Sequence, residues 1–315
     1  MISIIDHKRQ HFLPYGNAPT YNNHIISLWS MQQECQYVLA YIDINNYDDR
    51  EIAWPSNATN VHFVKTVHSK IHSVPLHLIL YENTIQNNRL FIDTDIIGDQ
   101  SLASEISALK LSCEYLFVAD ADEIIDTHKT STVNFNHCFG VGIISNIPKH
   151  TPWPIGMRCK SERDYMHVLK NLYIQPAVKT NYVYVNFQPH THPDRPNIMA
   201  LCKKLFGDHN HRIISEHDYI LELKQHMFVV SPESSGCDSS RTWEALYCQT
   251  IPIVKRSVLI DYYSKIFPMI VLDDWAELSQ HTFDFNLYKQ IMDKFPNYQH
   301  YLNCNNLINY VINNH

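Results

Sequence analysis

The chain has 315 residues, of which 45% are hydrophobic and 18% charged, and this composition is typical of a globular protein with a packed core. Its formal charge of −7 and the lack of a long basic run exclude general nucleic-acid binding, which needs a stripe of cations facing the phosphates. No stretch reaches the roughly 18 uncharged apolar residues of a membrane-spanning helix, and the N-terminus lacks a signal-peptide pattern, so we expect a cytoplasmic protein without a membrane span.

The first half of the chain alternates short apolar runs with segments of helical spacing, such as residues 101–111. Strands that alternate with helices over short loops form parallel sheets, so we expect an α/β domain over residues 1–155. Buried strands are expected at residues 37–42, 62–64, 76–81, 115–119 and 141–144.

The second half repeats this alternation over residues 156–315 and predicts a second α/β domain. The segment 146–157, NIPKHTPWPIGM, joins the two domains, because its three prolines prevent a continuous helix or a central strand. Residues 283–314 have helical spacing, and we leave open whether they pack back on the first domain. Strands are expected at 182–187, 227–230, 251–254 and 269–272, and helices at 197–206 and 241–248.

Residues 226–254, HMFVVSPESSGCDSSRTWEALYCQTIPIV, predict a strand, a loop of small residues, a helix and a second strand. The free N–H groups and the positive dipole end of this helix favour a diphosphate. The helix has three N-cap candidates, Asp238, Ser239 and Ser240. The loop residues Ser234, Ser235 and Gly236 are small enough for a ligand to approach the backbone.

Arg241 and Glu244 are three residues apart in the expected helix, which places both on one face. Arg241 suits bidentate pairing with phosphate oxygens, and Glu244 suits hydrogen bonds from ribose hydroxyls. The alternative is an ordinary Arg–Glu pair on a helix surface, which the spacing predicts equally well.

The run SPESSGCDSSRTWEALYCQTIPIV, followed by FPMIVLDDW at 267–275, resembles the nucleotide-binding half of exostosin-like glycosyltransferases, including those encoded by large viruses. YVYVNFQPHTHPDR at 182–195 and WPIGM at the domain junction are similar to further segments of that family. The resemblance implies the GT-B fold, in which two Rossmann-like domains face each other across a cleft and the C-terminal domain holds the nucleotide. The family has a glycine where this chain has Gln249-Thr250.

The resemblance implies transfer of a sugar from a nucleoside-diphosphate sugar to a hydroxyl of a glycan or glycoprotein acceptor, with inversion favoured, in the cytoplasm or, for a viral enzyme, the host cytoplasm. It places Arg195 and Arg241 near the diphosphate and Glu244 at the ribose. No cofactor is required beyond the sugar nucleotide, although a divalent cation stays open. The remaining expected binding residues are His190, Ser231, Glu233, Ser234, Ser235, Gly236, Asp238, Ser239 and Ser240.

Residues 115–123, YLFVADADE, predict a buried strand that ends in two aspartates separated by one residue. In the GT-A type of glycosyltransferase such a pair, here Asp120 and Asp122, holds a divalent cation against the diphosphate. The downstream Arg–Glu helix favours GT-B, because a GT-A enzyme has no use for a second nucleotide-binding unit. We therefore predict that Asp122, with Glu123 and Asp120 beside it, deprotonates the acceptor hydroxyl.

His190, His192 and Asp194 form an HxHxD sequence that also occurs in zinc hydrolases. With 20 histidines in the chain an HxH is nearly expected by chance, so we prefer a ligand-contacting loop with no bound metal. An inactive module that holds a nucleotide sugar without transferring it is a further alternative, because the nucleotide loop contains few glycines.

Overall fold

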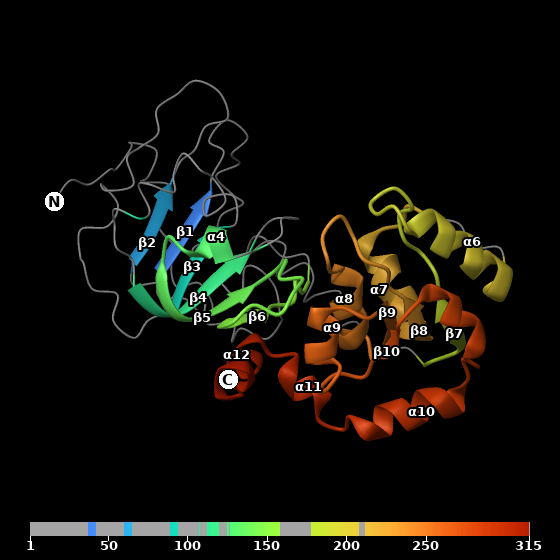
Figure 1. Ribbon diagram of the computed structural model, residues 1–315. Coiled ribbons are helices and arrows are strands. Elements are labelled where there is room, and N and C mark those ends of the chain that lie inside the picture. The colour runs from blue at the N-terminus through green and yellow to red at the C-terminus, as the bar shows by residue number, and fades with distance from the viewer. Residues whose placement is uncertain are drawn as a thin grey trace. The chain divides into compact units, whose positions relative to one another are not determined.

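The computed structural model of the chain describes residues 37–41, 60–64, 89–93, 107, 112–119, 125, 127–157, 178–207 and 212–314. The described residues up to Trp153 belong to one compact unit, and those from Pro154 onward belong to a second (Figure 1). Each unit holds its own parallel sheet. The protein therefore has two Rossmann-like α/β domains, as the sequence predicts.

The sheet of the first unit has six parallel strands in the order β2-β1-β3-β4-β5-β6. The strands expected at 37–42, 62–64 and 115–119 are confirmed as β1, β2 and β4, whereas the strand expected at 76–81 lies outside the described residues. The elements of this unit are β1 (Tyr37–Tyr41), β2 (Asn60–Val64), β3 (Arg89–Asp93), β4 (Ser112–Ala119), α4 (Thr127–Thr130), β5 (Asn134–Gly140) and β6 (His150–Pro152).

The prediction of a strand at 141–144 is wrong, because β5 ends at Gly140, just before this segment. Gly142 follows with a φ of 95°, a left-handed conformation that turns the chain out of the ladder. Val141 and Ile143 are nevertheless buried. The apolar run that suggested a strand therefore reflects burial of a turn.

The expected junction at 146–157 also contains β6, which lies at one edge of the six-stranded sheet. An edge position tolerates Pro152, because a proline cannot donate a hydrogen bond to a neighbouring strand. Directly after it, the fully buried Trp153 packs edge-on against Phe117 and Phe139. The core of the first unit therefore reaches up to the boundary between the units.

The sheet of the second unit has four parallel strands in the order β10-β9-β8-β7 (Figure 1). The strand expected at 182–187 is shorter in the structure and ends at Tyr184. Its other elements are β7 (Asn181–Tyr184), α6 (Arg195–Phe206), α7 (Glu216–Gln225), β8 (His226–Val230), α8 (Ser240–Tyr247), β9 (Ile251–Lys255), α9 (Val258–Tyr263), β10 (Ile270–Leu272), the 3-10 helix η3 (Trp275–Gln280), α10 (Phe285–Lys294), α11 (Tyr298–Tyr301) and α12 (Cys304–Asn313).

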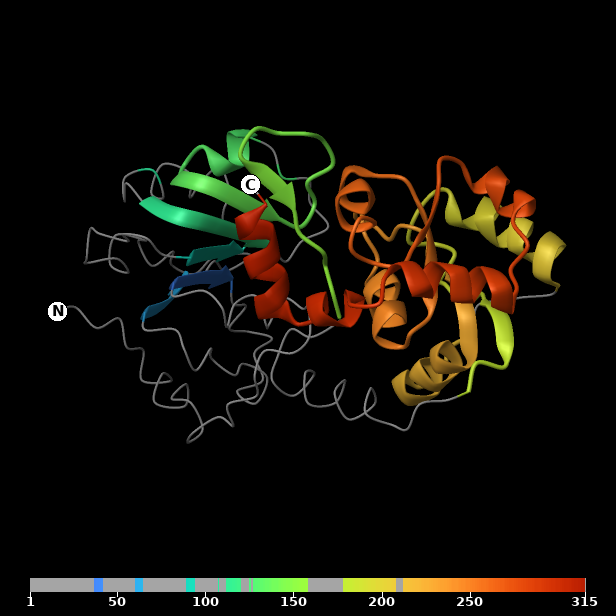
Figure 2. The same ribbon diagram turned by 90° about the horizontal axis from the view of Figure 1, so that it is seen from below.

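The helices that surround this sheet can be followed by their colours in Figure 2. Successive residues of β8 pack against two different sets of these helices. Phe228 and Val230 pack with α6, η3 and α10 on one face of the sheet. Val229 packs with α7 and α8 on the other face. Because both faces are covered, the central strands are continuously apolar, as in VV at the end of β8 and IPIV in β9.

Lys179 closes the amino-terminal edge of this sheet. Its ammonium donates hydrogen bonds to the His226 carbonyl at 2.6 Å, the Cys248 carbonyl at 3.0 Å and the Thr250 hydroxyl at 2.7 Å. These acceptors lie just after α7 and α8, where helix dipoles favour a cation. Burial lowers the pKa of Lys179 to about 7. Lys179 therefore holds the ends of two helices together at the edge opposite the carboxyl ends of the strands.

No helix among the described residues is long and apolar enough to cross a membrane. The described cysteines are free thiols, and all of them except Cys237 are buried.

Candidate functional site

The loop between β8 and α8 is folded by its own polar side chains. Ser231, which is buried at the end of β8, shares a hydrogen bond of 2.9 Å with the hydroxyl of Thr242 in α8. The backbone N–H of Ser234 donates to the carbonyl of Asp238, which closes the turn that contains Ser235 and Gly236. This compact turn follows a strand at the carboxyl edge of a parallel sheet, where α/β proteins bind ligands.

The carboxylate of Asp238 is the centre of this loop. One oxygen accepts hydrogen bonds from the backbone N–H of Ile155 at 3.0 Å and from the indole N–H of Trp243 at 2.7 Å. The other oxygen accepts from the N–H of Ser239 at 2.6 Å. Burial raises the pKa of Asp238 to about 6. Since all of these contacts are to protein groups, Asp238 positions the loop and the start of α8.

The first turn of α8 lacks a side-chain cap. Ser239 occupies the N-cap position, but its hydroxyl accepts no capping hydrogen bond from the helix backbone. The comparable serines before α7 and α9, Ser215 and Ser257, do accept such a bond. At α8 the Ser239 hydroxyl instead faces the guanidinium of Arg241 at 3.4 Å. The N–H of Thr242 already donates to the Ser239 carbonyl at 3.0 Å, so an anion at this helix start would be bound by the N–H groups of Ser240 and Arg241.

Arg241 lies beside this helix start with an unused donor. Its guanidinium lies 6.0 Å from the centre of the Phe187 ring, a distance compatible with a cation–π contact. Its Nε is buried and has no hydrogen-bond partner; among the described residues the only other such side-chain donor is the indole of Trp153. A buried unsatisfied donor costs roughly 1–3 kcal/mol, so Arg241 is a cation that a ligand can complete.

Arg195 contacts the start of the β8–α8 loop, and its N–H donors are already bonded to backbone carbonyls. Its side chain is buried, and its guanidinium donates to the carbonyls of Gln188 at 2.9 Å, Pro232 at 3.0 Å and Glu233 at 2.6 Å. These bonds tie the β7–α6 loop to the β8–α8 loop. Direct contact of Arg195 with a diphosphate stays a prediction, and in this structure Arg195 shapes the loop that surrounds the site.

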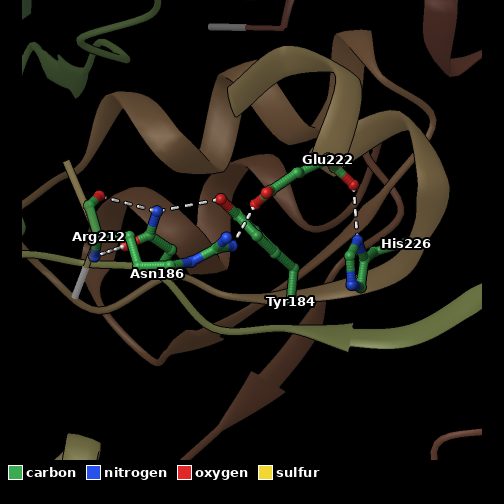
Figure 3. Close-up of polar contacts among 5 residues, drawn as sticks. All are labelled: Tyr184, Asn186, Arg212, Glu222 and His226. Atoms are coloured by element: carbon green, nitrogen blue, oxygen red, sulfur yellow. Dashed lines mark hydrogen bonds and ion pairs between the residues drawn. The ribbon is translucent and has the colours of Figure 1, made fainter. Parts of the chain in front are cut away.

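Phe187 lies next to both arginines. It directly follows Asn186, whose polar contacts are drawn in Figure 3. The Asn186 amide accepts from the backbone N–H of Arg212 at 2.9 Å and donates to the Arg212 carbonyl at 3.2 Å and to the Tyr184 hydroxyl at 3.1 Å. Glu222 of α7 binds the Arg212 guanidinium at 2.6 Å. The Asn-Phe pair therefore anchors the chain as it leaves β7.

Glu244 lies on the face of α8 that meets α7, where its carboxylate accepts a hydrogen bond of 2.9 Å from the hydroxyl of Tyr219. Burial raises the pKa of Tyr219 well above its usual value, Glu244 raises it further, and the charge of Arg241 lowers it. Arg241 and Glu244 thus act on one tyrosine, as their helical spacing predicts. Tyr219 was not identified from the sequence, because its segment carries no motif.

Gln249, at the position where the resemblance implies a glycine, adopts a φ of 56°. A left-handed residue commonly ends a helix, and a non-glycine residue there is strained. The carbonyl of Gln249 also accepts a hydrogen bond from the Tyr288 hydroxyl at 2.8 Å. The turn therefore keeps the glycine conformation without the glycine.

The HxHxD segment lies in the β7–α6 loop. His190 is exposed, whereas His192 is half-buried and its Nδ1 accepts from the backbone N–H of Asp194 at 3.2 Å. The ammonium of Lys255, at the end of β9, lies 3.8 Å from the Asp194 carboxylate. Within the described ranges no group of three or more His, Cys, Asp or Glu side chains could hold a metal ion. Sequence reasoning missed Lys255, although it directly follows the apolar IPIV run.

The expected catalytic carboxylates Asp120, Asp122 and Glu123 lie outside the described residues. The strand before them is confirmed, and its last residue, Ala119, pairs with Asp93 at the end of β3. Asp93 therefore ends the neighbouring strand at the same edge of the sheet, and the sequence reasoning did not single it out.

No protein-family model matches this chain, and no curated protein is significantly similar to it.

Proposed function

We propose that the protein binds a nucleoside-diphosphate sugar at the start of α8 and transfers the sugar to a hydroxyl of a glycan or glycoprotein acceptor, as a glycosyltransferase of the GT-B type. The observation that carries this proposal is the pairing of an uncapped helix start with Arg241, whose buried Nε has no hydrogen-bond partner among the described residues. The two Rossmann-like domains and the resemblance to exostosin-like enzymes support the same class.

In the proposed reaction the diphosphate lies against the first N–H groups of α8 and pairs with Arg241. As the bond between the sugar and the diphosphate breaks, negative charge grows on the diphosphate, and the helix dipole and Arg241 stabilise it. Glu244, next to Tyr219, binds the ribose hydroxyls. Asp122, with Glu123 and Asp120 beside it, remains the proposed base that takes the proton of the acceptor hydroxyl.

Calorimetry with two kinds of ligand, pyrophosphate and nucleoside diphosphates, separates the roles assigned to Arg241 and Glu244. Inorganic pyrophosphate reports the phosphate site alone, whereas UDP and GDP report the phosphate and ribose sites together. We expect Arg241→Gln to weaken binding of pyrophosphate and nucleotide by about 10- to 100-fold, the value of one charge-assisted pair. Glu244→Gln should weaken nucleotide binding only.

Arg256→Gln is the matched control, because this exposed arginine pairs with Asp261 and Asp273 on the surface. It should leave both affinities unchanged. Unchanged pyrophosphate affinity in Arg241→Gln would reject the phosphate site, and with it the proposed function. Donor turnover by the wild-type protein, measured as release of UDP or GDP from a panel of sugar nucleotides, separates an enzyme from an inactive binding module.

The metal-dependent alternative is favoured by one observation in the first unit. Asp93 ends β3 beside the end of β4, after which the chain continues with Asp120 and Asp122. Carboxylates at neighbouring strand ends suit a hard divalent cation. In this alternative activity is lost with EDTA, returns with Mn²⁺, and is abolished in Asp120→Ala; in the GT-B proposal EDTA has no effect.

A further inference from the structure

Four charged or titratable side chains lie at the carboxyl ends of three neighbouring strands. His192 and Asp194 lie in the loop after β7, Glu233 follows β8, and Lys255 ends β9. Because β7, β8 and β9 are adjacent and parallel, their carboxyl ends meet at one edge. We name these four residues the edge cluster.

Glu233 lies at the centre of the edge cluster. Burial raises the pKa of its carboxyl group, the charges of His192 and Lys255 lower it, and Asp194 raises it. Its backbone is fixed by the bond from Arg195 to the Glu233 carbonyl. Glu233 is therefore a positioned carboxylate with acceptors to offer to a ligand.

Lys255 supplies the complementary donor. Its ammonium lies 3.8 Å from the Asp194 carboxylate, which is beyond the 2.7–3.2 Å of a direct N–H···O hydrogen bond. One third of its side chain is exposed to solvent. A loosely paired, accessible ammonium can turn to a ligand at little energetic cost, since an exposed ion pair contributes at most about 1 kcal/mol.

We propose that the edge cluster binds the sugar of the donor and selects a neutral hexose over a uronic acid. The proposal rests on the function proposed above, because it places the sugar next to a diphosphate at the start of α8. A hexose presents hydroxyls that both donate and accept, and the cluster offers two carboxylates, one ammonium and one imidazole. The guanidinium of Arg195 is also nearby, but it is occupied by three carbonyls. The groups left for the sugar are therefore two carboxylates, one ammonium and one imidazole, so a sugar that carries its own carboxylate is disfavoured.

Calorimetry on the full-length protein tests the proposal with UDP, UDP-glucose, UDP-galactose and UDP-glucuronic acid, and with GDP and GDP-mannose. The comparison is made within the UDP compounds or the GDP compounds, whichever the protein binds. There we expect a neutral sugar nucleotide to bind at least tenfold more tightly than the nucleotide alone. UDP-glucuronic acid should lack this gain. Glu233→Gln should remove the gain and leave affinity for the bare nucleotide within twofold.

Lys255→Met is the second variant and should reduce the same gain. Lys289→Met, which breaks an exposed pair with Asp293 on α10, is the control and should change nothing. Melting temperatures show whether each variant is folded. Should Glu233→Gln destabilise the fold, Lys255→Met alone decides the outcome.

The proposal is overturned if the wild-type protein binds neutral and uronic sugar nucleotides equally, or if neither variant reduces the gain from the sugar. Its failure can be distinguished from failure of the proposed function. When nucleotide binding depends on Arg241 but the gain does not depend on Glu233 or Lys255, only the sugar subsite is rejected. When nucleotide binding does not depend on Arg241, the proposed function itself is rejected.

Discussion

Two loops at the same edge of the C-terminal sheet each bring an arginine to the ring of Phe187, and the two arginines differ in how their N–H groups are used. Arg195, at the end of the β7–α6 loop, is buried and donates to three carbonyls. Arg241, just after the β8–α8 loop, has a buried Nε that finds no hydrogen-bond partner in the described part of the chain. Both arginines lie near the site, but they differ in how many of their N–H donors are already hydrogen-bonded to the protein. An arginine with occupied donors stabilises the loops, whereas one with a free donor can bind a ligand.

The largest effect is expected on the free energy of unfolding, when Arg195 is replaced. Arg195→Met retains most of the aliphatic packing but removes the donors to Gln188, Pro232 and Glu233. Loss of these buried charge-assisted bonds should lower the free energy of unfolding by about 3 kcal/mol. Urea denaturation followed by tryptophan fluorescence measures this loss.

Arg241→Met is the matched variant, because it removes the other arginine beside Phe187. Its free energy of unfolding should stay within about 1 kcal/mol of the wild-type value, since the variant also removes a buried donor without a partner. Equal destabilisation by both substitutions would contradict the assignment of different roles to the two arginines.

A smaller, pH-dependent effect sharpens the comparison within the β8–α8 loop. The folded protein raises the pKa of Asp238 to about 6 from an ordinary value of 3.8, so the folded state binds a proton that the unfolded state releases. This contribution favours folding at low pH and is lost as the pH rises through 6. Between pH 5 and pH 7.5 it should fall by about 1 kcal/mol.

Asp238→Asn should be less stable overall, because an amide cannot accept all three of the hydrogen bonds that the carboxylate accepts. The variant should lack the pH-dependent part, which urea denaturation at the two pH values measures. Asp293→Asn, at an exposed ion pair, should keep the wild-type pH dependence. An Asp238→Asn profile parallel to the wild-type profile would show that this carboxyl group does not titrate in that range.

The smallest effect is expected at the other end of α8. Gln249→Gly relieves an exposed residue with a φ of 56° and should raise the free energy of unfolding by about 0.5–1 kcal/mol. Gln249→Ala should give no gain, because alanine has the same steric restriction. Nucleotide affinity should not change in either variant, so stabilisation accompanied by altered binding would mean that this turn also shapes the site.

Much of the fold follows from local sequence patterns. The apolar runs at β1, β4, β8 and β9 and the helical spacing of α6 and α8 identified these elements, because strands covered on both faces and amphipathic helices have distinct periodicities. Residues 141–144 were mistaken for a strand because burial alone made them apolar. Helix α9 was not predicted, since its six residues give too short a pattern.

The sequence by itself determined the two α/β domains, the turn and helix from Ser231 to Tyr247, and the shared face of Arg241 and Glu244. These features depend on residues close together in the chain, so local spacing is sufficient to define them. Only the tertiary structure decided that Arg195 is occupied by carbonyls, that Asp238 organises its loop, and that Lys255 lies beside Asp194. Such roles depend on contacts between distant strands, which the register of a folded sheet creates and no local pattern records.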